Sequence, residues 1–189
     1  MGIDPVTGLY TVQDVNQDEI INALDKTTVK ELKQYWFGGI QQNLRYKNWS
    51  LDVLFQFVKQ SQKNMYAVDG YVGAVGTKSA VYLNYWTPEN PDAQFQGPTS
   101  GANAKAVAAN TFFTQSDATV SDIFTVRLKN LSLNYSIPSL ADTKVGARLF
   151  VQGQNLWLSS NYKGIDPEFS AQGYTTPLRV VSAGISLNF

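Results

Sequence analysis

The 189-residue sequence contains neither cysteine nor histidine. Without cysteine the chain has no disulfide framework and no thiolate chemistry. Without histidine it lacks the commonest general base and the commonest transition-metal ligand. Neither a nucleophile motif nor a convergent pair of carboxylates takes their place, so we do not expect an enzyme.

Net charge and long apolar runs are missing as well. Fifteen basic residues balance fifteen acidic ones, which leaves no electrostatic basis for binding nucleic acid. No apolar run reaches the roughly eighteen residues that a membrane-spanning helix needs. The residues after Met1 also lack the basic and apolar regions of a signal peptide. If the strands described below lie in a membrane, we therefore expect the chain to be a piece of something larger.

Charged residues are scarce and aromatic residues are abundant. Charged residues make up 16% of the chain, against about a quarter in an ordinary soluble domain, and aromatic residues make up 13%. This balance suits a surface that partly faces lipid, and it also suits a sugar-binding β-protein.

The last nine residues alternate strictly between two kinds of side chain. Large or apolar residues occupy every second position from Val181 to Phe189, and small or polar residues occupy the positions between them. Such alternation predicts a strand with one apolar and one polar face. Its length matches a tilted membrane strand of about 9–11 residues, although a strand of a soluble sandwich could show the same pattern.

Alternation elsewhere predicts further antiparallel strands, joined by connections of two kinds. With the terminal one, the expected strands cover about 8–13, 36–46, 49–59, 123–137, 145–157 and 179–189. Lys47-Asn48 is typical of a hairpin turn, and a change of parity across Lys129-Asn130 indicates a β-bulge. The connections 47–48 and 138–144 are short, whereas 14–35, 60–120 and 158–178 are long. In outer-membrane barrels short turns lie on the periplasmic side and long loops outside, and every connection fits this rule.

These patterns predict an all-β chain of up-and-down strands that forms part of a transmembrane barrel wall. Five or six strands cannot close a membrane barrel, whose smallest examples have eight. The chain should therefore be the terminal wall of a larger barrel, or else a soluble domain.

One polar segment has the spacing of a calcium loop. Asp14, Asn16, Asp18 and Asp25 would supply oxygen ligands at loop positions 1, 3, 5 and 12. Glu19, however, occupies the position where the tight turn favours glycine. A solvated polar loop that binds no metal is the alternative.

Five motifs, in order along the chain, resemble those of the SusC/RagA-type TonB-linked outer-membrane transporters of the Bacteroidetes. Residues 127–138 (RLKNLSLNYSIP) resemble the family's "RLKNxxLxYxxP" strand, and 151–157 (VQGQNLW) its "V-x-GQNL" strand. Residues 162–168 (YKGIDPE) match "YxGxDPE", and 86–91 match "WTPENP". The segment with Asp14, Asn16 and Asp18 is similar to "DxNGDGxI", with Gln17 and Glu19 in place of two glycines.

The resemblance implies a C-terminal part of a 22-stranded barrel with long extracellular loops. It implies TonB-dependent import of oligosaccharides or peptides across the outer membrane, with a SusD-like lipoprotein capping the barrel mouth. The plug domain and the TonB-contact segment are absent from this sequence, so we expect that the chain could not transport alone. Phe189 resembles the terminal aromatic residue that the outer-membrane assembly machinery recognises.

Within this interpretation the two strand faces have different surroundings. Leu51, Val53, Phe55 and Phe57 would face lipid. The residues expected to face the lumen, mostly as a simply hydrated lining, are Arg45, Asp52, Gln56, Arg148, Gln152 and Gln154. Tyr82, Tyr85 and Trp86 would contact the lipoprotein or a sugar, or would only pack a long loop. The competing hypothesis is a soluble β-sandwich that binds carbohydrate on its Trp and Tyr residues.

Overall fold

The computed structural model describes residues 1–76, 78–138, 145–164, 166–169 and 175–189. The chain divides into two compact units. The strand unit comprises Lys33–Gln60, Asp122–Phe169 and Gly173–Phe189, and the loop unit comprises Met1–Leu32, Ser61–Ser121 and Ser170–Gln172. Most of the turn expected over 138–144 lies outside the described residues.

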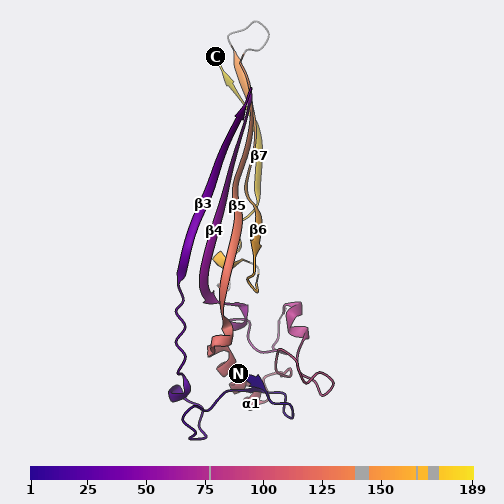
Figure 1. The fold of residues 1–189 in the computed structure, drawn as a ribbon. Coiled ribbons are helices and arrows are strands. Elements are labelled where there is room, and N and C mark those ends of the chain that lie inside the picture. The colour runs from indigo at the N-terminus through magenta and orange to yellow at the C-terminus, as the bar shows by residue number, and fades with distance from the viewer. Residues whose placement is uncertain (77, 139–144, 165, 170–174) are drawn as a thin grey trace. The chain divides into compact units, whose positions relative to one another are not determined.

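The strand unit is built on one five-stranded sheet in which each strand pairs with its neighbours in the sequence (Figure 1). Its strands are β3 (Gln34–Tyr46), β4 (Trp49–Lys63), β5 (Val120–Ile137), β6 (Gly146–Ser160) and β7 (Val180–Asn188). The pairs β3–β4, β5–β6 and β6–β7 are antiparallel. The predicted all-β, up-and-down architecture is thus confirmed.

The hairpin predicted at Lys47-Asn48 is present. Tyr46 pairs with Trp49 across these two residues, and the register continues without a shift to the pair of Trp36 with Lys59. Lys47 has a positive φ of 53°, which tight hairpin turns require of a central residue.

The predicted β-bulge is also confirmed, and the structure assigns the extra residue to β6. Leu128 pairs with Trp157, and Asn130 pairs with Gln154. One residue of β5 therefore lies opposite two of β6. One of these two, Asn155, has a φ of 52°, a left-handed conformation that asparagine tolerates better than most residues.

The strand expected over 8–13 is not part of this sheet. Only Tyr10–Thr11 (β2) are extended and paired, and they pair with Gly2–Ile3 (β1) in a separate two-stranded sheet. Gly8 has a φ of 68°, and a Cβ built on it would lie 2.2 Å from Cε3 of Trp86. Gly8 is therefore left-handed and packs against the indole ring of Trp86, so the expected strand cannot begin at this residue.

The long segment 60–120 contains a helix that the sequence pattern did not predict. Helix α1 spans Ala104–Gln115, and the side chain of Asn103 caps its N-terminus by accepting hydrogen bonds from the N–H groups of Lys105 and Ala106. Short 3-10 helices lie at Ala23–Asp25 (η1), Met65–Ala67 (η2), Ala80–Leu83 (η3), Asp117–Thr119 (η4) and, in the strand unit, Pro167–Phe169 (η5). Among the described residues, no helix has both the length and the apolar content to cross a bilayer.

Candidate functional site

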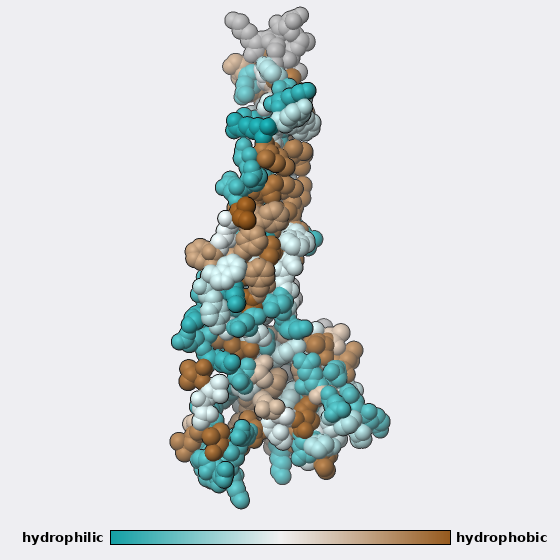
Figure 2. All heavy atoms as spheres, in the orientation of Figure 1, coloured by the Kyte–Doolittle hydropathy of each residue, from teal (hydrophilic) through white to brown (hydrophobic). Residues whose placement is uncertain are grey.

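One face of the five-stranded sheet, here called the apolar face, carries long rows of apolar side chains. Cross-strand pairs on it include Leu44 with Leu51, Ile40 with Phe55, and Leu149 with Ile185. The rings of Trp49 and Tyr135 lie 4.7 Å apart, which joins the rows of β4 and β5 on the same face. Figure 2 shows hydrophobic side chains gathered along the strands.

These rows are open to the surroundings. Ile40 is 61% exposed and Ile185 is 68% exposed, and Leu44, Tyr46, Val151 and Val181 are exposed too. A soluble sandwich would bury such rows against a second sheet, but the described residues supply no second layer in the strand unit. An extended apolar surface of this kind marks contact with lipid or with another protein.

The opposite face, here called the polar face, holds all six residues that were expected to line the lumen. The register places Arg45, Asp52 and Gln56 on it in β3 and β4, and Arg148, Gln152 and Gln154 on it in β6. Arg45, Asp52 and Arg148 line one pocket of about 390 Å³ near the β3–β4 turn, whereas the three glutamines lie elsewhere on the face. The carboxylate of Asp52 accepts a hydrogen bond from the side-chain amide of Asn43.

A buried ion-pair cluster joins β5 to the segment that follows β6. Both carboxylate oxygens of Asp166 accept hydrogen bonds from Nη2 of Arg127, at 2.7 and 2.8 Å. The side chains of Arg127 and Asp166 are only 4% and 3% exposed. Glu168 lies 3.4 Å from Arg127 and 3.3 Å from Lys129. The cluster therefore connects two of the sequence motifs, RLKN and DPE, a contact that sequence reasoning did not identify.

The aromatic residues singled out in the long loop have different surroundings. Tyr82 is 5% exposed and belongs to the core of the loop unit with Tyr66, Val72 and Phe95. Its hydroxyl donates a hydrogen bond to Asp69, and burial is the main cause of its raised pKa. Tyr82 thus packs the core of the loop unit, which is one of the two alternatives that the sequence left open. Tyr85 and Trp86 are half-buried, and a contact role for them stays a prediction.

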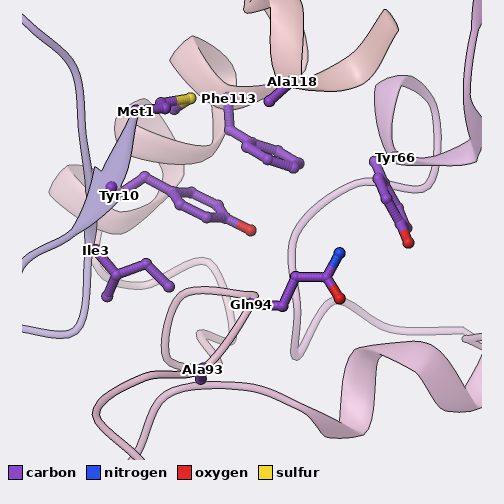
Figure 3. Close-up of a pocket in the computed structure, with 9 residues that line it drawn as sticks. Met1, Ile3, Tyr10, Tyr66, Ala93, Gln94, Phe113 and Ala118 are labelled. Atoms are coloured by element: carbon purple, nitrogen blue, oxygen red, sulfur yellow. The ribbon is translucent and has the colours of Figure 1, made fainter. Parts of the chain in front are cut away.

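A pocket of about 310 Å³, here called the aromatic pocket, lies in the loop unit (Figure 3). The rings of Tyr10 and Phe113 stack at its side, with centroids 4.3 Å apart and planes 7° apart. Tyr66 and Gln94 contribute polar groups. The full lining is Met1, Gly2, Ile3, Tyr10, Tyr66, Ala93, Gln94, Phe113 and Ala118. No sequence pattern links these residues, because they come from four separate segments.

The acidic segment folds as a loop held by its own carboxylates. Asp14 accepts hydrogen bonds from the N–H groups of Gln17 and Glu19, both at 2.7 Å. Gln17 and Glu19 have φ values of 60° and 63°, so the two positions where the resembling motif has glycine are left-handed here. Within the described part of the chain, no group of three or more acidic side chains is placed to hold a metal ion. Calcium binding by this segment stays a prediction.

Phe189 follows directly after β7 and is 98% exposed. Its ring is therefore available to another molecule, and its role in assembly stays a prediction.

Comparison with known proteins gives consistent matches. No family model matches the chain. Two receptors of Formosa agariphila, TonB-dependent receptors P3 and P26, are 28% and 29% identical over 168 and 210 residues. The matches cover 87% and 98% of this chain but only 16% and 20% of the receptors. The chain thus spans at most about a fifth of these relatives.

Solved structures give the same result. The RagAB peptide importer in its "open-open" state matches with a TM-score of 0.67 and 25% identity, covering 100% of this chain and 21% of that chain. A second structure, of the RagAB peptide transporter, has a TM-score of 0.65 at 24% identity and covers 22% of its chain, which shows the fold alone.

The chain is thus similar in sequence to part of the TonB-dependent receptors and in fold to part of the RagAB peptide importer, and its single sheet with an exposed apolar face agrees with both matches. Among these, the chain is similar to a segment of the SusC/RagA-type transporters of the Bacteroidetes, and the resemblance drawn from the sequence motifs is confirmed.

Removing one partner of the buried ion pair should destabilise the strand unit strongly. Arg127→Met or Asp166→Asn leaves the other charged group buried without its partner, which costs roughly 3–5 kcal/mol. The double variant should lose clearly less free energy of unfolding than the sum of the losses in the two single variants, because it leaves no charged group buried alone. Urea unfolding in detergent measures these losses. Lys129→Met is the control, because its more exposed pair with Glu168 contributes about 1 kcal/mol or less. Equal losses for Arg127→Met and Lys129→Met would contradict the assignment.

Acid should loosen the acidic loop through Asp25. The N–H groups of Asn22 and Val15 donate to its carboxylate and lower its pKa. A lowered pKa means that the carboxylate stabilises the loop above its ordinary pKa of 3.8, and that this contribution is lost as the pH falls below that value. We expect Asp25→Asn to raise deuterium uptake over residues 14–25 at pH 7. Asp92→Asn is the control, and uptake that rises equally in both variants would reject the role of Asp25.

Proposed function

We propose that this chain forms the terminal wall of the barrel of a TonB-dependent importer in the outer membrane of a Bacteroidetes bacterium. The observation that carries the proposal is the exposed apolar face of a single sheet whose other face is polar. The resemblance implies 22 strands for the whole barrel. The apolar face would contact lipid, and Arg45, Asp52, Gln56, Arg148, Gln152 and Gln154 would line a hydrated lumen.

The open edges of the sheet support this proposal. Strands β3 and β7 each have a strand partner on one side only among the described residues. In a bilayer an unpaired strand edge leaves backbone N–H and C=O groups unsatisfied, at several kcal/mol for each group. Both edges would therefore pair with further strands of the same barrel.

The imported solute would be a peptide or an oligosaccharide. The similarity to a structure described as a peptide importer supports the peptide. A SusD-like lipoprotein would act at the outer mouth, and the TonB complex would act through parts of the protein outside this chain. The relatives give no support to the alternative, a soluble carbohydrate-binding sandwich, and the exposure of the apolar face argues against it.

Two adjacent positions in β7 test the wall directly. Ala183 lies on the apolar face opposite Val151, and Ser182 lies on the polar face opposite Gln152. An arginine facing lipid near the middle of the bilayer costs about 2–4 kcal/mol. We therefore expect Ala183→Arg to reduce the folded, heat-modifiable form of the full-length protein in outer membranes, and Ser182→Arg to leave it nearly unchanged. Equal loss in both variants, or greater loss from Ser182→Arg, would reject the proposed faces.

Removing the terminal ring tests the proposed assembly signal. Deletion of Phe189 from the full-length protein should lower the amount of assembled, heat-modifiable barrel, because the exposed ring would be the group that the assembly machinery recognises. Phe189→Tyr keeps a ring and should assemble normally, which separates recognition from a general effect of altering the terminus. Normal assembly of the deletion variant would remove this role.

A further inference from the structure

The apolar face of β3 and β4 has a charged residue at only one of its two ends. The pair of Tyr46 with Trp49 lies at the end with the hairpin turn, and the pair of Trp36 with Lys59 lies at the other end. Between these two pairs the apolar face of the two strands, which are fully described, carries no charged side chain. Lys59 is thus the first charge met on this face, and Trp36 beside it is 47% exposed.

The distance between the two ends matches the thickness of a membrane. Lys59 lies ten residues after Trp49 in β4, a length of about 33 Å at roughly 3.3 Å per residue. A strand tilted by about 45° then rises about 23 Å, close to the apolar band of about 25 Å in outer-membrane barrels. In the proposed barrel wall, on which this inference rests, the ammonium group of Lys59 therefore lies at the level of the lipid headgroups.

A β-bulge at Tyr35 brings a second lysine to the same place. The register shifts by one residue between Gln34 and Trp36, which makes Tyr35 an extra residue of β3. Such a bulge changes the direction of a side chain, so Tyr35 can reach Lys59 although its neighbour Trp36 lies on the apolar face as well. The ammonium groups of Lys33 and Lys59 both lie over the Tyr35 ring, at 5.5 and 5.7 Å from its centroid.

Two ammonium groups that share one ring favour an anion beside them. The ring attracts each cation but brings no negative charge that would balance it. Among the described residues, the charged group of Lys59 has this ring as its contact and no acidic partner. Lysine stems cover apolar surface while their charged groups reach the headgroup level, where phosphate is the anion within reach.

We infer that Lys33 and Lys59 bind the phosphate group of an anionic membrane lipid at this end of the apolar face, with Tyr35 holding both ammonium groups in place. The acyl chains of the same lipid would cover the apolar rows that continue from Lys59, where Ile40 is 61% exposed. A free phosphate ion carries the same group, but it would make no use of these rows. The occupant is therefore a lipid.

The test measures lipid binding to the purified full-length protein in detergent by native mass spectrometry. Dioleoylphosphatidylglycerol has a net negative headgroup, and dioleoylphosphatidylcholine has the same chains without net charge. Each lysine near an anionic lipid changes the affinity about fivefold, so the parent should prefer the first lipid roughly tenfold or more. Lys33→Gln and Lys59→Gln should each weaken its binding about fivefold, and the double variant should lose the preference. Tyr35→Leu should weaken it about threefold, because both lysines lose the ring that holds them.

The matched control is the double variant Lys78→Gln/Lys105→Gln. It also removes two lysines, both from the loop unit, and Lys78 likewise lies over a tyrosine ring, that of Tyr82, at 6.0 Å. This control should keep the preference of the parent. An excess of inorganic phosphate should not displace the anionic lipid, because the apolar face also holds the acyl chains.

Three outcomes would overturn the inference. They are equal binding of the two lipids by the parent, an equal loss of preference in the control and in the Lys33→Gln/Lys59→Gln variant, and displacement of the lipid by inorganic phosphate. Heat-modifiability of every variant is measured in parallel, which excludes misfolding as the cause of a loss. Failure of the lipid site leaves the different responses to Ala183→Arg and Ser182→Arg intact, whereas failure of the proposed wall does not.

Discussion

Pairing of backbone groups between neighbouring strands is the constraint on which the strand unit depends. Each strand of the sheet obtains its hydrogen bonds from the strands beside it, and a bilayer offers no water to replace a missing partner. Side chains are then free to divide between the two faces, as Ala183 and Ser182 do in β7. The apolar face needs no second protein layer in lipid, which explains how a sheet with such exposed rows can be a stable wall.

The bulge and the ion-pair cluster lie close together on β5, and both interrupt the regular pattern. One residue of β5 opposes two of β6 at the bulge, so the register between these two strands shifts there. Arg127 lies two residues before Lys129, and its guanidinium donates a hydrogen bond to the carboxylate of Asp166. A buried pair of this kind adds little net stability compared with apolar packing, but its geometry fixes which segment lies against which strand. We interpret the cluster as the element that positions the DPE segment.

The sequence predicted the wall strands because their signal is local. Alternation with period 2 is visible within each strand, and a change of parity at Lys129-Asn130 already indicates the bulge. Helix α1 was not predicted because its alanine-rich sequence shows no apolar stripe. Asn103 caps this helix, but an asparagine in a polar segment does not by itself indicate that a helix follows. The contact of Arg127 with Asp166 joins residues 39 apart in sequence, and the aromatic pocket gathers four segments. Contacts of this range depend on tertiary packing, which no local pattern encodes.

The abundance of aromatic residues has two separate physical causes, and burial distinguishes them. Tyr46 and Trp49 at the β3–β4 turn are 70% and 47% exposed, as expected of rings at a membrane interface. Tyr82 and Phe95 are 5% and 1% exposed, because they pack with Tyr66 and Val72 in the core of the loop unit. The amino-acid composition does not separate exposed rings from buried rings. The high aromatic content therefore agreed equally well with lipid contact and with sugar binding. Once the rings are sorted by exposure, the exposed rings of the strand unit agree with lipid contact, and the buried rings of the loop unit are explained by packing.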